Sequence, residues 1–276
     1  MRKELHLTMY DTNNCWYTNV CDKFGTEDCC WKCKRMQQTK FLLDLSNLRP
    51  IHARPLHLDL EGLNQDCVNY INGIFYNVSY FVQNGYNAYF YGPTGTGKTS
   101  WSCKILKTYF GEIAESTNFT CRGLFISVPM LLLNIKRNIK PSTYIEDFDE
   151  LLNDIQKVDL VIWDDIIQTS PTDFESQWLY TLINERLLRK KANIFTSNLA
   201  PSDLLKADKR LYSRICTSAD CVCFDCKDKR NERKFSDVIT EFLAENPNGY
   251  DNMFGEVSDS NESEIITDTN EEDTTN

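Results

Sequence analysis

The segment of this chain that most constrains its fold is Gly92-Pro93-Thr94-Gly95-Thr96-Gly97-Lys98-Thr99. The apolar run 88–91 leads directly into it, and a helical stretch follows through residue 110. A glycine-rich turn between a buried strand and a helix lets successive backbone N–H groups point to one place, beside the positive end of the helix dipole. Such a turn predicts phosphate binding, with Lys98 on the β- and γ-phosphates of a nucleotide and the Thr99 hydroxyl on Mg²⁺. The expected nucleotide contacts are Gly92, Pro93, Thr94, Gly95, Thr96, Gly97, Lys98, Thr99 and Ser100, with Asp164 farther along the chain.

The rest of the chain from residue 87 onward alternates short β-rich runs with helical stretches, which is typical of a parallel sheet flanked by helices. We expect strands at 88–91, 123–128, 160–163 and 193–196, and a last one near 221–224. We expect helices at 66–83, at 128–139 and at about 174–189, besides the one that follows the glycine-rich turn. In the helix at 174–189 the apolar residues share one face, which predicts core packing. These residues are Phe174, Trp178, Leu182 and Ile183. The predicted fold class is therefore α/β, a P-loop NTPase sheet flanked by helices.

Two acidic residues, Asp164 and Asp165, end the predicted strand at 160–163. A P-loop needs a carboxylate for its metal at the end of a neighbouring buried strand. We therefore expect Asp164 to hold Mg²⁺ through water and Asp165 to act as the general base toward the attacking water. The next strand ends in Thr196-Ser197-Asn198, and an amide at this place is suited to orient that water. The predicted catalytic residues so far are Lys98, Asp165 and Asn198, and the predicted cofactors are ATP and Mg²⁺.

In their order along the chain, these motifs resemble those of the AAA+ ATPases. The later segment Arg210-Leu211-Tyr212-Ser213-Arg214-Ile215 belongs to the same series, and the resemblance covers residues 60–235. Within AAA+ the sequence is most similar to the bacterial and phage helicase loaders of the DnaC type and to the transposition helper IstB. The lead-in from Tyr70-Ile71-Asn72 to the glycine-rich turn also resembles that of phage-type loaders.

The resemblance implies that Arg214 is an arginine finger, which reaches the γ-phosphate bound by a neighbouring subunit. That role implies a homo-oligomer with ATP sites between subunits, and Arg210 is the nearest competitor for it. Arg230 matches the late arginine sensor more weakly. The second acid of the strand end is usually Glu in AAA+ proteins, and Asp165 is one methylene shorter, which favours slow hydrolysis. By resemblance, the partners are a replicative ring helicase and single-stranded DNA.

Charge and composition divide the chain into unequal parts. Residues 241–276 contain 11 acidic residues and no Lys or Arg, which predicts a disordered acidic tail. Residues 1–240 contain 30 basic and 29 acidic residues, so the net charge of −10 does not argue against binding to nucleic acid. We expect a small Cys-rich N-terminal module at 1–36, a linker at 37–65, an AAA+ ATPase domain at 66–240 and the tail at 241–276.

Twelve cysteines occur in a chain that has neither a signal-peptide pattern nor an apolar run of the roughly 18 residues that a membrane span needs. We therefore expect a cytoplasmic protein with reduced thiols and no membrane partner. The resemblance to helicase loaders implies a bacterium or a phage-infected cell. Four thiols, Cys15, Cys21, Cys30 and Cys33, predict a zinc site in the N-terminal module, with Cys29 as an alternate ligand. The other interpretation of this cluster is a reduced Cys-rich arm.

Single-stranded DNA requires a basic and partly aromatic surface. The candidates are Lys136-Arg137 with Lys140, and Arg189-Lys190-Lys191, although both are also ordinary solvated helix ends. Three other functions remain open. A transposition helper ATPase would serve a transposase instead of a helicase. A P-loop kinase would phosphorylate a small molecule and would need neither Arg214 nor the Thr-Ser-Asn sensor. A zinc-dependent scaffold would bind ATP without hydrolysing it.

Overall fold

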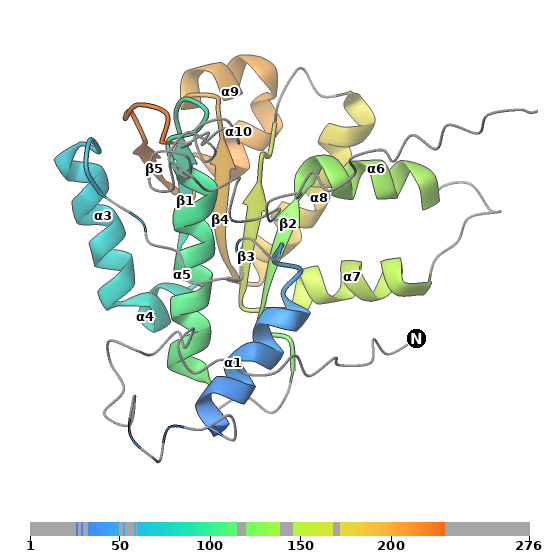
Figure 1. Cartoon of the computed structure of the whole chain (residues 1–276). Coiled ribbons are helices and arrows are strands. Elements are labelled where there is room, and N and C mark those ends of the chain that lie inside the picture. The colour runs from blue at the N-terminus through green and yellow to red at the C-terminus, as the bar shows by residue number, and fades with distance from the viewer. Residues whose placement is uncertain are drawn as a thin grey trace, which may run out of the picture. The chain divides into compact units, whose positions relative to one another are not determined.

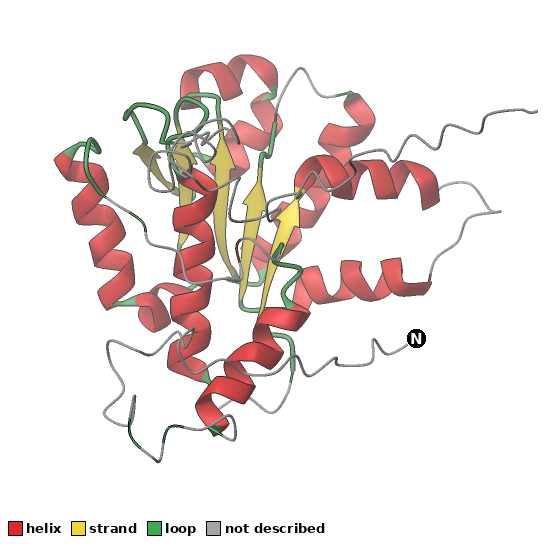
Figure 2. Ribbon diagram, viewed as in Figure 1, coloured by secondary structure: helices red, strands yellow, loops and turns green. Residues whose placement is uncertain are grey.

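A five-stranded parallel sheet forms the centre of the protein (Figures 1 and 2). The computed structural model describes residues 26, 29, 33–49, 52, 58, 60–114, 120–138, 146–167 and 172–229. The strands are β1 (Asn87–Tyr91), β2 (Gly123–Ser127), β3 (Leu160–Asp164), β4 (Ala192–Ser197) and β5 (Asp220–Cys223). They follow the order β2-β3-β4-β1-β5, and every pair is parallel. The predicted α/β class and parallel sheet are thus confirmed, and the carboxyl ends of the strands meet at one edge.

Helices cover both faces of this sheet (Figure 1). They are α1 (Lys34–Leu45), α3 (Gln65–Tyr76), α4 (Val78–Gln83), α5 (Lys98–Ile113), α6 (Val128–Asn138), α7 (Glu146–Lys157), α8 (Asp173–Leu188), α9 (Pro201–Ala207) and α10 (Lys209–Ile215). Alternate side chains of one strand enter different cores: Phe90 packs with α1, α3, α4 and α5, whereas Tyr89 packs with α6, α7, α8 and α10. Strands β1 to β4 are buried and mostly apolar because both faces are covered, whereas the edge strand β5 begins with exposed residues. In the described part of the chain, no helix is long and apolar enough to cross a membrane.

Several segments differ from the sequence-based expectation, among them the predicted helix at 66–83 and the segment of α1, while α7, α9 and α10 were not predicted either. The single helix predicted at 66–83 is two helices, because Asn77 leaves the helical conformation (φ −136°, ψ 32°) and its side chain donates to the Gly73 carbonyl at 3.0 Å. Helix α1 was not predicted, and the proposed boundary between residues 36 and 37 falls inside it. Most of its residues are polar, so its short apolar face is hard to recognise in the sequence. Leu42 and Leu43 of this face pack into the core beside α5.

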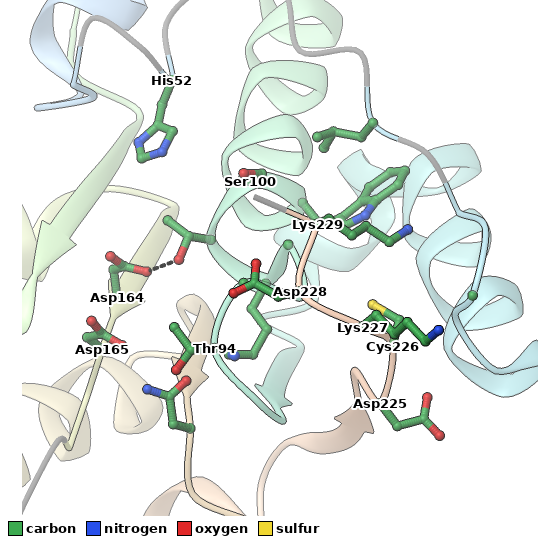
Figure 3. Close-up of a pocket in the computed structure, with 18 of the residues that line it drawn as sticks. His52, Thr94, Ser100, Asp164, Asp165, Asp225, Cys226, Lys227, Asp228 and Lys229 are labelled. Carbon is green, nitrogen blue, oxygen red and sulfur yellow. Dashed lines mark hydrogen bonds between the residues drawn. The ribbon is translucent and has the colours of Figure 1, made fainter. Parts of the chain in front are cut away.

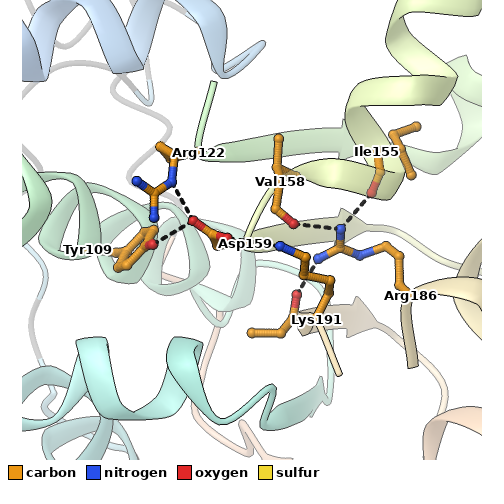
Figure 4. A network of polar contacts seen from close by, with 8 residues as sticks. Tyr109, Arg122, Ile155, Val158, Asp159, Arg186 and Lys191 are labelled. Carbon is orange, nitrogen blue, oxygen red and sulfur yellow. Dashed lines mark hydrogen bonds and ion pairs between the residues drawn. The ribbon is translucent and has the colours of Figure 1, made fainter. Parts of the chain in front are cut away.

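Polar contacts join the amino ends of the strands, at the edge of the sheet opposite the glycine-rich turn (Figure 4). Buried Arg186 of α8 donates to the carbonyl oxygens of Ile155, Val158 and Ala192 and to the side-chain oxygen of Asn193. Asp159, just before β3, accepts from Arg122, from Tyr109 and from Lys191. These contacts hold α8, β3 and β4 together at the amino edge of the sheet. The predicted catalytic residues Asp165 and Asn198 follow the opposite ends of β3 and β4.

Candidate functional site

A cavity of about 970 Å³ opens at the carboxyl ends of β1, β3 and β4 (Figure 3). Several predicted site residues line it together: Thr94, Gly95, Gly97, Lys98, Thr99, Ser100, Asp164, Asp165 and Asn198. They come from segments more than 100 residues apart in the sequence, and the parallel sheet brings them to one edge. The cavity therefore combines the glycine-rich turn, the paired acids and the predicted sensor amide.

The glycine-rich turn has a backbone shape that side chains would prevent. Gly92 and Gly95 have φ values of 140° and 81°, in the range that favours glycine. A Cβ on Gly92 would overlap the backbone of Phe224, and one on Gly95 would overlap the carboxylate of Asp228. Helix α5 starts at once after Gly97 and has no side-chain cap on its first N–H groups. An uncapped helix N-terminus behind such a turn is suited to bind an anion.

Lys98 is buried, and its ammonium is held on the turn. Its Nζ donates to the carbonyl oxygens of Gly92 at 2.8 Å and Pro93 at 2.6 Å. These contacts place the cation beside the uncapped start of α5. The donor set thus fits the phosphates of a nucleotide, which are acceptors with negative charge.

Asp164 and Thr99 supply the oxygen atoms expected for Mg²⁺. The Thr99 hydroxyl donates to Asp164 Oδ1 at 2.7 Å, and the Thr196 hydroxyl donates to the same oxygen at 2.9 Å. Burial raises the pKa of Asp164, and the two hydroxyl hydrogen bonds only partly offset that effect. A carboxylate and a hydroxyl are hard oxygen ligands of the kind that Mg²⁺ prefers. The residues present therefore fit this metal ion.

Thr196 links the two acids to each other, a role that the sequence motif alone did not assign. Its hydroxyl donates to Asp164 and accepts from the backbone N–H of Asp165 at 3.1 Å. Asp165 has a left-handed backbone, with φ of 54°, directly after β3. Its side chain and Asn198 both line the cavity, as their expected roles require. Thr196 of the neighbouring strand β4 thus contacts both the carboxylate of Asp164 and the backbone of Asp165.

The segment Phe224–Lys229, which follows β5, crosses the glycine-rich turn and was not predicted to do so. The backbone N–H of Lys229 donates to the Gly95 carbonyl at 2.8 Å, and buried Cys226 contacts the Thr96 carbonyl at 3.6 Å. The Asp228 carboxylate, labelled in Figure 3, lies so close to Gly95 that a Cβ on this glycine would overlap it. An acidic side chain is therefore placed at the phosphate-binding surface.

Arg49 and His52 also line the cavity, although they lie in the segment predicted to be a linker. The His52 ring packs on Phe125 of β2, with ring centroids 5.7 Å apart, and points toward the cavity above Asp164 (Figure 3). Burial lowers the pKa of His52, although the nearby Asp164 charge acts in the opposite direction. No local motif marks these two residues, because their position depends on the packing of α1 against the sheet.

The predicted arginine finger lies outside this cavity. Arg214 of α10 is exposed and donates to the Tyr180 hydroxyl at 2.9 Å, with its guanidinium 5.4 Å from the Tyr180 ring centre. It lines a separate hollow of about 370 Å³ with Tyr180, Lys209, Arg210 and Ser213. Arg214 is not among the residues that line the cavity around Lys98. Arg230, the weaker sensor candidate, lies outside the described residues.

The predicted zinc site falls mostly outside the described part of the chain. Cys15, Cys21 and Cys30 are not described, whereas Cys33 is exposed and Cys29 is half-buried, both as free thiols. Among the described residues, no group of three or more His, Cys, Asp or Glu side chains is arranged to hold a metal ion. Zinc binding by the N-terminal module stays a prediction.

Comparison with known proteins places this chain beside bacterial replication proteins. Residues 70–221 match the family model described as the bacterial DnaA ATPase domain. The chromosomal replication initiator protein DnaA of Ureaplasma parvum serovar 3 (strain ATCC 700970) is 24% identical over 176 residues, which cover 60% of this chain and 35% of that protein. The chain thus spans about a third of the length of the curated relative that it matches.

Two solved structures are also similar to this one. The crystal structure of the DnaC helicase loader has a TM-score of 0.48 and 16% identity, covering 69% of this chain and 99% of that one. The structure of AMPPCP-bound DnaA from Aquifex aeolicus has a TM-score of 0.46 and 22% identity, covering 72% of this chain and 57% of that one.

Proposed function

This chain belongs to the family of bacterial DnaA ATPase domains, and from that premise we propose that it is a Mg²⁺-dependent ATPase that loads a replicative helicase onto single-stranded DNA. The observation that carries the ATPase part is the meeting of three separate motifs in one cavity. Lys98, Asp164 with Thr99, and Asp165 with Asn198 all line it. An ATPase site needs each of these parts: a phosphate cradle, a metal ligand and a group that activates water.

Each side chain has a separate task in this proposal. Lys98 and the first N–H groups of α5 bind the phosphates, while Thr99 and Asp164 hold the metal ion. Mg²⁺, when bound, neutralises charge on the phosphate oxygens. Asp165 accepts a proton from the attacking water, and Asn198 orients that water toward the γ-phosphate. Because Asp is shorter than Glu, the reach of Asp165 is limited and hydrolysis is slow.

The position of Arg214 supports an oligomer with shared ATP sites. Its guanidinium is exposed, and the hollow that it lines also holds the side chains of Lys209 and Arg210. A cationic hollow away from the chain's own nucleotide cavity is suited to meet the γ-phosphate on a second copy. An arginine placed in this way stabilises the charge that develops during phosphoryl transfer.

Helicase loading is the finer part of the proposal and rests on the order of the motifs. The domain at 66–240 would be the motor, in the cytoplasm, and the Cys-rich segment at 1–36 would be the zinc-stabilised part that binds the helicase. A transposition helper ATPase would share the same cavity and differ only in its partner. No feature of the cavity favours a small-molecule kinase.

ATP hydrolysis by the purified full chain tests the proposal. We expect Mg²⁺-dependent release of inorganic phosphate, and we expect Lys98→Ala to reduce it by about 100-fold or more, because the phosphate ligand is lost. Lys157→Ala, on the exposed end of α7, is the matched control and should leave the rate unchanged. Phosphate transfer to a metabolite, or full activity in Lys98→Ala, would defeat the proposal. For the loading step, helicase transfer onto a single-stranded circle should require ATP and intact Lys98.

A further inference from the structure

Three tyrosines are exposed on one side of the protein, far from the ATP cavity. Tyr76, at the end of α3, is 86% exposed, Tyr80 of α4 is 60% exposed, and Tyr86, before β1, is 47% exposed. The rings of Tyr80 and Tyr86 lie 5.9 Å apart at 45°, and the buried Phe81 supports Tyr86 from below, 6.1 Å away. Two aromatic faces are therefore held in place next to solvent without contributing to the core.

The turn between α8 and β4 packs on the backbone of residues 85 and 86, next to the segment that carries these rings. Gly85 packs so closely on the Lys190 carbonyl that a Cβ would overlap it, and the backbone N–H of Asn193 donates to the Tyr86 carbonyl at 3.4 Å. The turn carries Arg189, Lys190 and Lys191. This backbone contact brings a run of three cationic residues next to the segment that carries Tyr86.

Lys190 is the cation of this run that is most available to a ligand. Lys191 pairs with Asp159 at 3.0 Å, and Arg189 lies 3.9 Å from Glu185. Lys190 is exposed and forms no ion pair with any residue that the structure describes. The Arg189 charge is thus partly neutralised, whereas that of Lys190 faces solvent.

The backbone of Lys190 indicates that folding stability alone does not explain a lysine here. Its φ is 52°, and the N–H groups of Lys190 and Lys191 donate to the Leu187 and Arg186 carbonyls, which closes helix α8 with a left-handed residue. Glycine is the usual residue at that position of a helix end, because a side chain there is strained. A lysine in place of glycine supplies a charge at this helix end that forms no ion pair within the described residues.

We propose that Tyr80, Tyr86 and Lys190 form a contact site for single-stranded nucleic acid. Bases would stack on the two rings, and backbone phosphates would lie against Lys190 and Arg189. Exposed rings next to cations are the combination that binds single strands with little dependence on sequence. The site rests on the proposed role in DNA replication and gives that role a location.

The proposed nucleic-acid site and the nucleotide cavity lie at opposite ends of the same two strands. Tyr86 precedes β1 and Lys190 precedes β4, whereas Gly92 and Asn198 follow those strands. The two sites therefore lie at opposite edges of the sheet, and both can be occupied together. The sheet and α8, rather than the glycine-rich turn, connect them.

Fluorescence anisotropy of the full chain with labelled single-stranded oligonucleotides, without ATP, tests this site. We expect the double variant Tyr80→Leu/Tyr86→Leu to raise Kd by about tenfold or more, because stacking is lost while apolar surface remains. Tyr80→Phe/Tyr86→Phe keeps both ring faces and should bind like the parent. DNA and RNA oligonucleotides of one sequence should respond alike, because neither stacking nor phosphate contact reads the sugar.

Lys190→Gly separates charge from folding. It should raise Kd by about threefold or more and reduce the slope of log K against log salt by about 0.7, the value for one phosphate contact on a single strand. The melting temperature should not fall, because glycine suits the left-handed backbone. Lys157→Gln, which removes one charge at the exposed end of α7, should change neither quantity.

Two results would overturn the site: a parent chain that does not bind the oligonucleotides, or a leucine double variant that binds as tightly as the parent. A surface for a partner protein would give the second result. ATP hydrolysis measured without nucleic acid should be equal in all these variants. Failure of the ATPase proposal would appear in the Lys98→Ala comparison instead, so the two failures are distinguishable.

Discussion

Asp165 has a left-handed backbone conformation at the place proposed for the catalytic base. A left-handed residue other than glycine costs about 1 kcal/mol, and Asn and Asp tolerate it best. Asp165→Asn removes the basic carboxylate oxygen, so we expect ATP hydrolysis to fall by about 100-fold. Because Asn also adopts the left-handed conformation readily, the free energy of unfolding should change little. Asp165→Gly should be equally inactive but more stable by about 1 kcal/mol. Steady-state phosphate release and urea denaturation measure these two effects, and an Asn variant with the parent rate would exclude Asp165 as the base.

Asp228 is a second residue whose position bears on nucleotide binding. Its carboxylate lies against Gly95, where the negative charge of a bound phosphate would be close. We expect Asp228→Asn to bind ATP about fivefold more tightly, because removal of a like charge about 4 Å away is worth about 1 kcal/mol when water screens it fully. Isothermal calorimetry with ATP and Mg²⁺ checks this, with Asp203→Asn on exposed α9 as the control. Unchanged or weaker affinity in Asp228→Asn would show that the carboxylate does not oppose the nucleotide.

At the residue scale, the sequence indicated the site wherever the chemistry is local. The glycine-rich turn, the Asp164–Asp165 pair and Asn198 each follow a strand, so their meeting in one cavity could be expected from parallel pairing alone. Thr196, His52 and Asp228 could not be found in this way. Their contacts join segments distant in the sequence: Thr196 reaches across from a neighbouring strand, and Asp228 crosses back over the turn.

Among the elements, the strands were easier to predict than the helices. A strand that is covered on both faces is a run of mostly apolar residues. Such a run can be recognised in the sequence without knowing which strands pair with it. Helix α7 was missed although Phe148, Leu151, Leu152 and Ile155 have helical spacing, because acidic residues dominate its sequence. The break at Asn77 depends on one side chain that donates to the Gly73 carbonyl, which periodicity does not reveal.

The contacts of Asp159 make the joint between β2, β3 and β4 dependent on pH. Burial by itself raises the pKa of Asp159, but hydrogen bonds from Lys191 and Arg122 outweigh this and hold it below its ordinary value of 3.8. The ion pairs therefore add stability above the ordinary value, and this contribution is lost as the pH falls through the lower folded-state value. We expect Asp159→Asn to lose about 1 kcal/mol of unfolding free energy at pH 7.

Urea denaturation at several pH values checks this expectation. The difference between the parent chain and Asp159→Asn should shrink toward zero as the pH falls below the ordinary value of 3.8. The exposed pair Asp203–Lys206 is the control, and Asp203→Asn should change stability little at any pH. A difference for Asp159→Asn that stays constant with pH would mean that packing, rather than the ion pairs, accounts for it.

For the whole molecule, the two edges of the sheet have different tasks. The carboxyl edge holds the residues proposed to bind and hydrolyse ATP, and the amino edge holds the Arg186 and Asp159 contacts and the proposed nucleic-acid site. Arg214, the proposed arginine finger, does not line the cavity around Lys98. Under the proposed function, a complete ATP site would need a second copy, in an arrangement that repeats head to tail.

Mixing two inactive variants tests that requirement. Arg214→Ala keeps its own cavity, and Asp165→Asn keeps its arginine, so each alone should lose about 100-fold or more in ATP hydrolysis. In an equal mixture, a cavity from the first variant meets an arginine from the second in about a quarter of the interfaces, and roughly a quarter of the parent rate should return. Arg210→Ala, in the same hollow, should remain active. If this mixture remains inactive but Arg210→Ala mixed with Asp165→Asn regains activity, Arg210 is the arginine finger. If neither mixture regains activity, each chain hydrolyses ATP without an arginine from its neighbour.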